Sequence, residues 1–411
     1  MSQHRRVRRC AIVMIEPRER LRLDVGGLLS GENALAAYIV VVALAPHLGV
    51  EIEIAKDERD ALLSLGETPW VPIESLARTI PSATLERLIE KGLVIGDGPE
   101  HEHLRSRDEA VRARHWRPLS AVAHYFSRWK DSGEDEDARF TRHRPIADLV
   151  DECGLPPPHL TERVASSERH RFSSPQESAL DELLQRRVTC RNFETTAMLP
   201  ERDLGDILQR VLGCLAIVEV MPGVHGLKKS YPSGGGLHPL EPYLLIQRVE
   251  GVPAGLYHYH AGEHALEPLS LLSDEEAQRQ AKIIVAGQGF FADAPVHIVL
   301  AARFERTFWK YRNHPKAYRA ILLEAGHVSQ NLYLAATEAG LGAYVTAAIN
   351  EIDIEQMFGL DALEQSPVVV CGFGRRASRR VMLEFDPLGT VWPDAEADAS
   401  VTTADTHPPG A

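Results

Sequence analysis

Two adjacent side chains, Lys310 and Tyr311, have the chemistry to remove or supply a proton. Their ordinary pKa values are both about 10, so either group needs a perturbing site to act as a base near neutrality. Trp309 lies beside them, and the apolar run 296–300 predicts a strand just upstream. Neighbouring Lys and Tyr residues are common, so the local sequence also allows a purely structural role.

A glycine-rich segment, 231–241, has the composition of a loop that lies against a flat or anionic ligand. Three consecutive glycines carry no Cβ atoms and accept positive φ, so the backbone can approach a ligand closely. The apolar run 243–246 predicts a buried strand directly after it. The segment therefore predicts a cofactor-binding loop, with an ordinary glycine-rich turn as the alternative. The candidate contact residues are Pro232, Ser233, Gly234, Gly235, Gly236 and His238.

A short extended segment places Arg187, Thr189 and Arg191 at every second position. Period two puts the three side chains on one face of a strand. Guanidinium groups bind oxyanions through a rigid pair of donors, so this face suits a phosphate with neighbouring hydroxyl groups. A salt-bridged surface strand is the alternative.

The elements that must position these residues alternate between helix and strand. A helix is expected over 178–186, just before the arginine segment, and a long helix over 317–339 ends at Gly340. The apolar positions of the long helix share one face. They are Ile321, Leu322, Ala325, Val328, Leu332 and Ala336.

Two further strands follow the long helix, at 340–349 and 367–374. The second ends at Arg375 and Arg376, which are placed either for a second phosphate contact or simply as a solubilising strand end. Between the glycine-rich segment and the helix, His258 and His260 share a strand face with His264 nearby. No carboxylate or thiol sits at a usual metal-ligand spacing from them, so we expect no metal site.

Composition excludes several classes of protein. The 411 residues include 58 acidic and 45 basic side chains, a net charge of −13, and the pI is about 5.8. This balance argues against nucleic acid as a partner. The apolar stretch 34–45 is too short to cross a bilayer, and the start of the chain lacks signal-peptide features. The five scattered cysteines fit a reducing compartment, so we expect a cytoplasmic enzyme.

The length predicts more than one domain. Helical spacing over 61–94, followed by a strand-like end, is typical of a winged-helix unit. Its presumed recognition helix, 82–93, mixes acidic with basic residues, so a unit that holds a peptide or packs on the enzyme is favoured over a DNA reader. The expected divisions are an N-terminal region 1–150 with an acidic loop at 131–145, a linker 151–177, a catalytic domain 178–392 and a disordered tail 393–411.

Together these segments resemble the nitroreductase-like flavin family, and within it the SagB-type dehydrogenases, the azoline oxidases of ribosomal peptide maturation. The resemblance covers 178–392, and 50–130 more loosely. It rests on ordered motifs ahead of a helix that ends in Gly340-Leu-Gly342. The motifs are Arg187-x-Thr189-x-Arg191, the segment 232–241, Gly255-Leu-Tyr-His-Tyr259, and Trp309-Lys-Tyr311 followed by Ala317-Tyr-Arg319.

The resemblance implies an α+β fold with a mixed sheet flanked by helices, and an intertwined homodimer with FMN in each interface cleft. The ribityl phosphate would be held by Arg187, Thr189 and Arg191, with Arg375 or Arg376 adding contacts. The isoalloxazine ring would lie along the 232–236 loop, where Gly236 stands in place of the Asn of many nitroreductases. Backbone groups of three residues would face the N5 edge. These are Thr346, Ala347 and Ala348.

The implied reaction is oxidation of a thiazoline or oxazoline in a precursor peptide to the aromatic azole. FMN would accept a hydride, Lys310 or Tyr311 would remove the neighbouring proton, and molecular oxygen could reoxidise the flavin. A cyclodehydratase is a possible partner, and oxidation of a peptide Cα–Cβ bond is a related possibility. Two alternatives from other classes are an NAD(P)H-dependent nitro- or quinone reductase and a non-catalytic scaffold that binds the precursor peptide.

Overall fold

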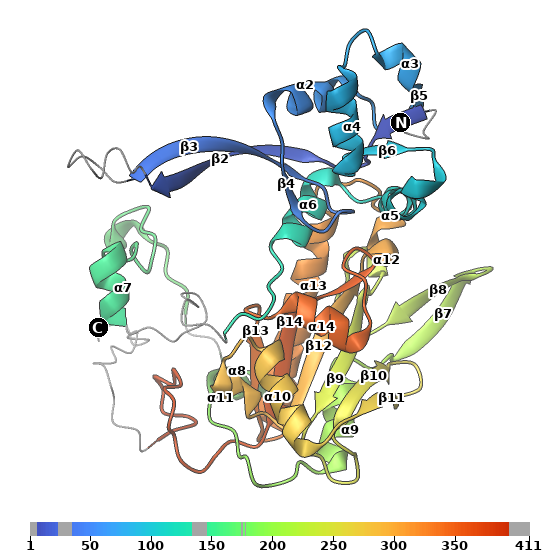
Figure 1. Ribbon diagram of the computed structural model, residues 1–411. Helices are drawn as coiled ribbons and strands as arrows, with labels where there is room; N and C mark the ends of the chain where they lie inside the picture. Colours follow the sequence, from blue (N-terminus) through green and yellow to red (C-terminus); the bar gives the residue numbers. More distant parts are fainter. Residues whose placement is uncertain (1–5, 24–34, 134–145, 174–175, 177, 394–411) are drawn as a thin grey trace.

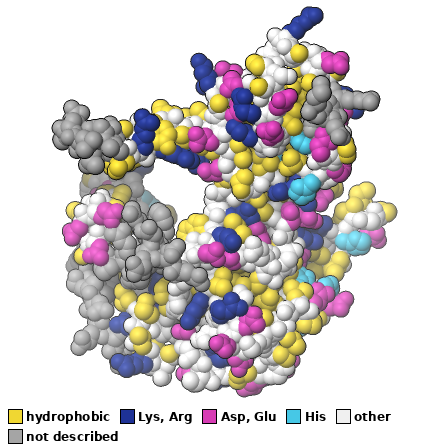
Figure 2. Space-filling view, in the orientation of Figure 1, with side chains coloured by type: hydrophobic (Ala, Val, Ile, Leu, Met, Phe, Trp, Pro, Cys, Tyr) yellow, Lys and Arg dark blue, Asp and Glu magenta, His cyan; other side chains and the backbone are white. Residues whose placement is uncertain are grey.

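The computed structural model describes residues 6–23, 35–133, 146–173, 176 and 178–393. In Figure 1 a smaller N-terminal part, in blue and cyan, lies at one end of a larger part built around a central sheet. Acidic and basic side chains are interspersed over the face seen in Figure 2. The expected tail, apart from its first residue, and most of the expected acidic loop lie outside the described residues.

The central sheet has six strands in the order β11-β10-β9-β12-β14-β13. Neighbouring strands are antiparallel, and a parallel bridge between Thr189 and Ala343 adds a parallel contact at the β13 edge. The expected mixed sheet is therefore confirmed. Its strands are β9 (Leu240–Ile246), β10 (Gly255–His260), β11 (Ala265–Leu271), β12 (Val296–Arg303), β13 (Gly342–Thr346) and β14 (Gln365–Gly374).

Helices cover both faces of this sheet, and its middle strands β9 and β12 are accordingly mostly apolar and buried. Leu244 points into the core shared with α9 and α13, whereas its neighbour Leu245 points into the core shared with α10 and α14. The helices of this part are α8 (Ala179–Arg186), α9 (Glu201–Val211), α10 (Asp274–Ile284), α11 (Gly289–Ala292), α12 (Phe304–Phe308), α13 (Ala317–Glu338) and α14 (Glu351–Phe358).

The long helix α13 forms where helical spacing predicted it, and it ends before Gly340, whose φ is +72°. Burial of Ile321, Ala325 and Val328 confirms most of the expected apolar face. Leu322 is an exception, because it is 42% exposed. Its place next to Ile321 turns it about 100° around the helix, away from the sheet.

The N-terminal part contains a three-stranded sheet in the order β5-β1-β6, with helices packed around it. Its helix–strand–helix–helix–strand order is compatible with the expected winged-helix unit, whose assignment stays a prediction. The core of the unit is formed by Leu62, Leu88 and Leu93. The elements are β1 (Arg6–Arg9), α2 (Lys56–Ser64), β5 (Val71–Pro72), α3 (Ile73–Leu76), α4 (Ser82–Glu90) and β6 (Val94–Gly96).

A long hairpin extends from this part, and the sequence analysis did not foresee it. It pairs β2 (Met14–Leu23) with β3 (Leu35–Leu44), and β4 (Glu51–Glu53) pairs with the base of β3. The hairpin projects away from the body in Figure 1, and apolar and basic side chains gather along it in Figure 2. The apolar stretch at 34–45 is therefore, over its described residues, a strand.

The two parts are joined by buried polar contacts. The indole of Trp116 donates to the Leu363 carbonyl at 2.9 Å, and His124 Nε2 is 2.8 Å from the Ala362 carbonyl. Arg128 forms a buried ion pair with Glu355. Trp116, His124 and Arg128 lie on or beside α6 (Pro118–Phe126), which follows η1 (Pro99–His101) and α5 (Glu102–Ala113).

The remaining elements are peripheral. They are α7 (Ile146–Cys153), η2 (Ser166–Glu168) and the hairpin of β7 (Ala216–Met221) and β8 (Val224–Lys228). All five cysteines are free thiols. Within the described ranges, no helix is both long enough and apolar enough to cross a membrane. The expected domain boundaries stay predictions.

Candidate functional site

The glycine-rich segment forms a single tight turn, η3 (Gly234–Gly236), that rests on the N-terminal part of α13. Gly235 and Gly236 both have φ of +70°, a conformation that side chains rarely adopt. A Cβ atom at Gly234 would lie 3.3 Å from the Cβ atom of Ala320 on α13. The loop therefore packs closely on the helix, and glycine is required by the backbone at two of the three positions.

Lys310 and Tyr311 lie directly against this loop. A Cβ atom at Gly235 would come within 2.6 Å of the Tyr311 hydroxyl oxygen and 3.0 Å of Lys310 Nζ. Lys310 is exposed and Tyr311 is half-buried, and Lys310 Nζ is 5.5 Å from the centre of the Tyr311 ring. The structure thus brings together the proton-handling pair and the loop, which are about 75 residues apart in sequence.

Behind the loop lies a buried group of polar side chains. The Ser233 hydroxyl donates a hydrogen bond to Glu324 on α13 and accepts one from the His238 backbone N–H at 2.8 Å. Burial raises the pKa of Glu324 to about 7 and lowers the pKa of His238 to about 4. His238 has a φ of +46°, so this residue turns the chain into β9 at a conformational cost.

The arginine segment lies at the other end of α13. The hydroxyl groups of Thr189 and Tyr333 are hydrogen-bonded at 3.0 Å, and the guanidinium carbon of Arg187 is 5.4 Å from the centre of the Tyr333 ring. Tyr333 follows Glu324 by nine residues, which is about 13 Å along the helix axis. Within one chain, the two expected parts of the cofactor site are therefore separated along α13.

The backbone at Arg191 is held in place by Glu384, which lies in the segment that follows β14. Glu384 accepts hydrogen bonds from the backbone N–H groups of Arg191 and Asn192 at 2.6 and 3.0 Å. The same carboxylate forms an ion pair with Arg376, which also donates to the Val188 carbonyl at 2.7 Å. Arg376 is thus committed to holding this strand, whereas Arg375 is exposed. Of the two candidate phosphate ligands, only Arg375 has its guanidinium open to solvent.

The segment after β13 lies beside the arginine segment. Gln288 donates from Nε2 to the Thr346 hydroxyl at 3.2 Å and to the Ala348 carbonyl at 2.8 Å. Ala347, between them, is exposed. The Arg191 guanidinium carbon is 6.0 Å from the centre of the ring of Phe290, two residues beyond Gln288. The three small residues expected at a flavin edge therefore lie near the expected phosphate side.

Four residues of this region were missed by sequence reasoning. Glu324 left a signal, because a carboxylate on the buried face of an otherwise apolar helix is unusual. Tyr333 lies on that same helix. Gln288 and Glu384 left none, because each acts through backbone groups distant in sequence.

The histidines weighed as metal ligands have other partners. His258 lies between Glu241 on β9 and Glu267 on β11, at 3.3 and 2.6 Å. The spacing in the sequence did not predict these carboxylates as partners, because each reaches His258 from a neighbouring strand of the sheet. The hydrogen bonds to both raise the pKa of His258. Among the described residues, no group of three or more His, Cys, Asp or Glu side chains is arranged to hold a metal ion.

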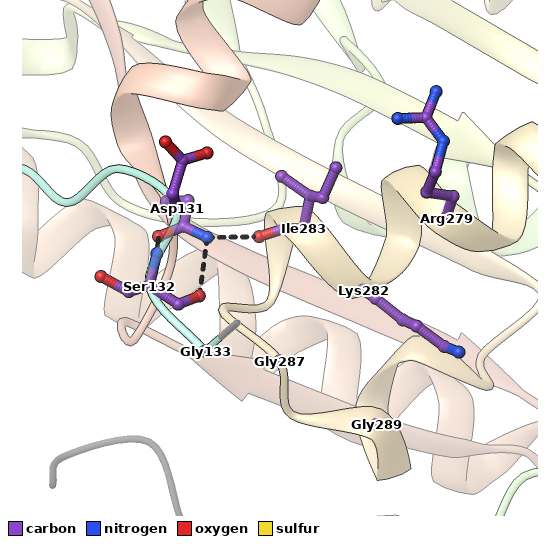
Figure 3. A pocket seen from close by; sticks show the side chains of 9 residues that line it. Asp131, Ser132, Gly133, Arg279, Lys282, Ile283, Gly287 and Gly289 are labelled. Atoms are coloured by element: carbon purple, nitrogen blue, oxygen red, sulfur yellow. Dashed lines mark hydrogen bonds between the residues drawn. The ribbon is translucent and has the colours of Figure 1, made fainter. Parts of the chain in front are cut away.

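A cavity of about 400 Å³ lies between α10 and the segment 131–133, and its lining includes Gly287 and Gly289 on either side of Gln288 (Figure 3). Arg279 and Lys282 line it, and the side chain of Asn350 bridges the Ser132 and Ile283 carbonyls at 3.0 and 2.9 Å. It contains none of the expected site residues. We assign it to the junction of the two parts of the chain.

The model of the nitroreductase family matches residues 184–375. The putative nitroreductase MJ1384 of Methanocaldococcus jannaschii is 30% identical over 201 residues, which cover 49% of this chain and 93% of that protein. The chain belongs to the nitroreductase family, as the sequence motifs indicated.

Two peptide-processing proteins are also similar. The trifolitoxin-processing protein TfxB of Rhizobium leguminosarum bv. trifolii is 33% identical over 144 residues, or 34% of this chain and 38% of that protein. The microcin B17-processing protein McbC of Escherichia coli is 31% identical over 158 residues, or 37% of this chain and 56% of that protein. The matched segments thus span about two fifths and about half of these two relatives.

Proposed function

We propose that this protein is an FMN-dependent dehydrogenase that oxidises a thiazoline or oxazoline in a precursor peptide to the aromatic azole. The observation that carries the proposal is the contact of Lys310 and Tyr311 with Gly235. Oxidation of an azoline requires a base that removes a C–H proton beside the flavin, whereas a nitro or quinone reductase adds protons to oxygen, which solvent can supply. The similarity to TfxB and McbC, both named for peptide processing, supports a peptide substrate.

The residues present fit FMN. Arg187, Thr189 and Arg375 offer cationic and hydroxyl donors for a phosphate. A Cβ atom built at Gly236 would have no atom within 4 Å, so one side of the loop is open for a flat ring. The loop presents backbone rather than side chains, as close approach to an aromatic ring requires.

Bound at this loop, FMN would supply a two-electron acceptor for the hydride released from the azoline ring. The protein's own residues remove the proton from the neighbouring ring atom, so that the ring loses one hydride and one proton and becomes aromatic. Lys310 and Tyr311 are the groups placed for this step, since both lie at the loop surface. Trp309, which is exposed beside them, offers a flat apolar surface for the heterocycle.

We also propose that the enzyme is a homodimer. The outer surface of α13 exposes Leu322 and Leu323, and α8 exposes Leu180 and Leu184. The hairpin of β7 and β8 adds further exposed apolar residues. Apolar surface on neighbouring elements is typical of an interface between subunits. Within one chain, the glycine-rich loop and the arginine segment are separated along α13. In a dimer, the loop of one copy would lie near the arginine segment of the other.

A precursor peptide and a cyclodehydratase are the proposed partners, because an azoline must be formed from a peptide before it can be oxidised. The five free cysteines suit a reducing compartment, and we propose the cytoplasm. The N-terminal unit is the proposed peptide-holding or packing domain.

The first experiment is an absorbance spectrum of the purified protein, followed by heat release and identification of the bound ligand. Two flavin bands, with FMN in the released fraction, are expected. An azoline-containing peptide is then supplied under air, and loss of two mass units is measured. Lys310→Ala and Tyr311→Phe are each expected to lower kcat at least about 100-fold, the scale of general acid–base catalysis. Lys316→Ala, at an exposed lysine six residues from Lys310, is the matched control.

The same assays separate the alternatives. Rapid NAD(P)H-dependent reduction of nitro compounds that is unaffected by both variants would favour a reductase. A protein that stays colourless when FMN is added, yet binds the precursor peptide, would be a scaffold. Unequal effects of the two variants across a pH profile would tell which group is the base.

A further inference from the structure

Three buried side-chain atoms around the glycine-rich loop lack hydrogen-bond partners among the described residues, namely Glu324 Oε1, His238 Nδ1 and the Tyr231 hydroxyl oxygen. Glu324 is 2% exposed and His238 is 5% exposed. Glu324 Oε1 and His238 Nδ1 each have no partner within the described residues, although they lie only 3.9 Å from each other. The other carboxylate oxygen of Glu324 accepts from Ser233. Unpaired polar atoms at this depth are costly, so the pair needs an explanation.

A single proton between these two atoms would give each of them a hydrogen-bond partner. If Glu324 and His238 were both without it, a charged carboxylate would be buried, facing either the lone pair of Nδ1 or, in the other neutral tautomer, an Nδ1–H group. If His238 carried it, both ring nitrogens would be protonated and the imidazolium would be desolvated. A proton on Oε1 instead lets the carboxyl group donate to Nδ1, while the other oxygen still accepts from Ser233. This arrangement satisfies both atoms without burying a charge, once Oε1 and Nδ1 close from 3.9 Å to hydrogen-bonding distance.

The electrostatic surroundings agree with this assignment. Burial is the main cause both of the raised pKa of Glu324 and of the lowered pKa of His238. The positive charge of Lys229 acts in the opposite direction on Glu324 and is outweighed. The charged and titratable groups that face the pair from the surrounding elements are Lys228, Lys229, Tyr231 and Arg306, and Glu241 in turn acts on Lys229 and Tyr231.

We propose that a single proton held by Glu324 and donated to His238 locks the glycine-rich loop onto α13, which makes Glu324 a positioning residue for the loop. The role in FMN binding rests on the proposed function, whereas the shared proton does not. Ser233 connects the pair to the loop, because its hydroxyl is hydrogen-bonded to both Glu324 and the His238 backbone. Loss of the proton would leave a buried carboxylate against Nδ1 and would loosen the turn at Gly234–Gly236.

The protonation of Glu324 is tested first, in protein that contains no cofactor. Infrared difference spectra between wild type and Glu324→Gln, recorded at pH 6, are expected to show one protonated carboxyl band in the wild type that disappears as the pH rises through about 7. Glu351→Gln is the matched control, since the pKa of Glu351 is also raised to about 7 by burial and Glu351 lies on α14, away from the loop. Should Glu324→Gln not fold, the band that remains in Glu351→Gln reports Glu324. Absence of any such band at pH 6 would overturn the proposal.

The second measurement is FMN affinity as a function of pH, which is monitored through the quenching of flavin fluorescence on binding. Wild type and Glu351→Gln are expected to lose affinity by up to tenfold per pH unit above about pH 7. Glu324→Gln, a neutral side chain of the same shape, is expected to keep the low-pH affinity throughout. A pH dependence that persists in Glu324→Gln would overturn the positioning role. If FMN binds none of the three proteins, the proposed function fails, and the infrared band still decides whether the proton is shared.

Discussion

The hydroxyl group of Tyr311 occupies the space that a Cβ atom at Gly235 would need, 2.6 Å from the position of that atom. Lys310 Nζ lies almost as close, at 3.0 Å. The proton-handling pair thus limits which residue the loop can carry at this position, and the loop limits where the two side chains can lie. A glycine at this position is needed for two separate reasons, the positive φ and the contact.

The two reasons can be separated by comparing Gly235→Ala with Gly236→Ala. Both positions have φ of +70°, but a Cβ atom at Gly236 has no atom within 4 Å. Gly236→Ala should therefore lower the free energy of unfolding by about 1 kcal/mol, the cost of the left-handed conformation. Gly235→Ala should lower it further, because Tyr311 must move. Urea denaturation measures both, and equal losses would argue against the contact.

Arg375 and Arg376 should behave differently although they are neighbours. Arg376→Ala leaves the fully buried carboxylate of Glu384 without its cation, so we expect a loss of about 3 kcal/mol of stability. Arg375→Ala should leave stability unchanged and weaken FMN binding, because this guanidinium is exposed. Thermal unfolding and flavin titration of the two variants check this. If both variants were equally stable, the role assigned to Glu384 would be wrong.

The junction of the two parts should weaken in acid. His124 is buried, and its burial lowers the pKa from 6.5 to about 4. A lowered histidine pKa means that the stabilisation is complete above about pH 6.5 and is lost as the pH falls towards 4. The shift corresponds to about 3 kcal/mol.

His124→Gln should remove this part of the pH dependence. Urea denaturation at pH 7 and pH 4.5 measures it as the difference between the variant and the wild type. His103→Gln, at an exposed histidine on α5, is the control and should keep the dependence of the wild type. A wild type and His124→Gln with parallel pH profiles would contradict the assignment.

The proposed dimer predicts a monomer when the surface of α13 is charged. Leu323 is 60% exposed, and Leu323→Arg should lower the mass in solution from twice 45.5 kDa to that of one chain. FMN binding should be lost at the same time. Leu63→Arg, at a 68% exposed leucine on α2, should change neither property. Light scattering coupled to size-exclusion chromatography gives the mass.

The sequence by itself determined much of this protein, because its signals are local. Helical spacing located α13 to within a residue, and apolar runs located β9, β12 and β14. The glycine triplet marked a turn with positive φ, since glycine alone adopts that conformation without strain. The ordered motifs also identified the family, which the 30% identity to the putative nitroreductase MJ1384, over 93% of that protein, confirmed.

Only the tertiary structure decided which distant residues meet. The approach of Tyr311 to Gly235, the burial of Glu324 against Ser233 and His238, and the engagement of Arg376 by Glu384 all join separate segments. The sequence spacing does not distinguish an arginine that is paired with a buried carboxylate from one that is exposed to solvent. Burial and partners arise from the packing of whole elements. The long β2–β3 hairpin was missed for a related reason. The apolar residues of its outer half, Leu23 and Ile39 among them, are exposed, so its sequence lacks the alternation that marks a half-buried strand.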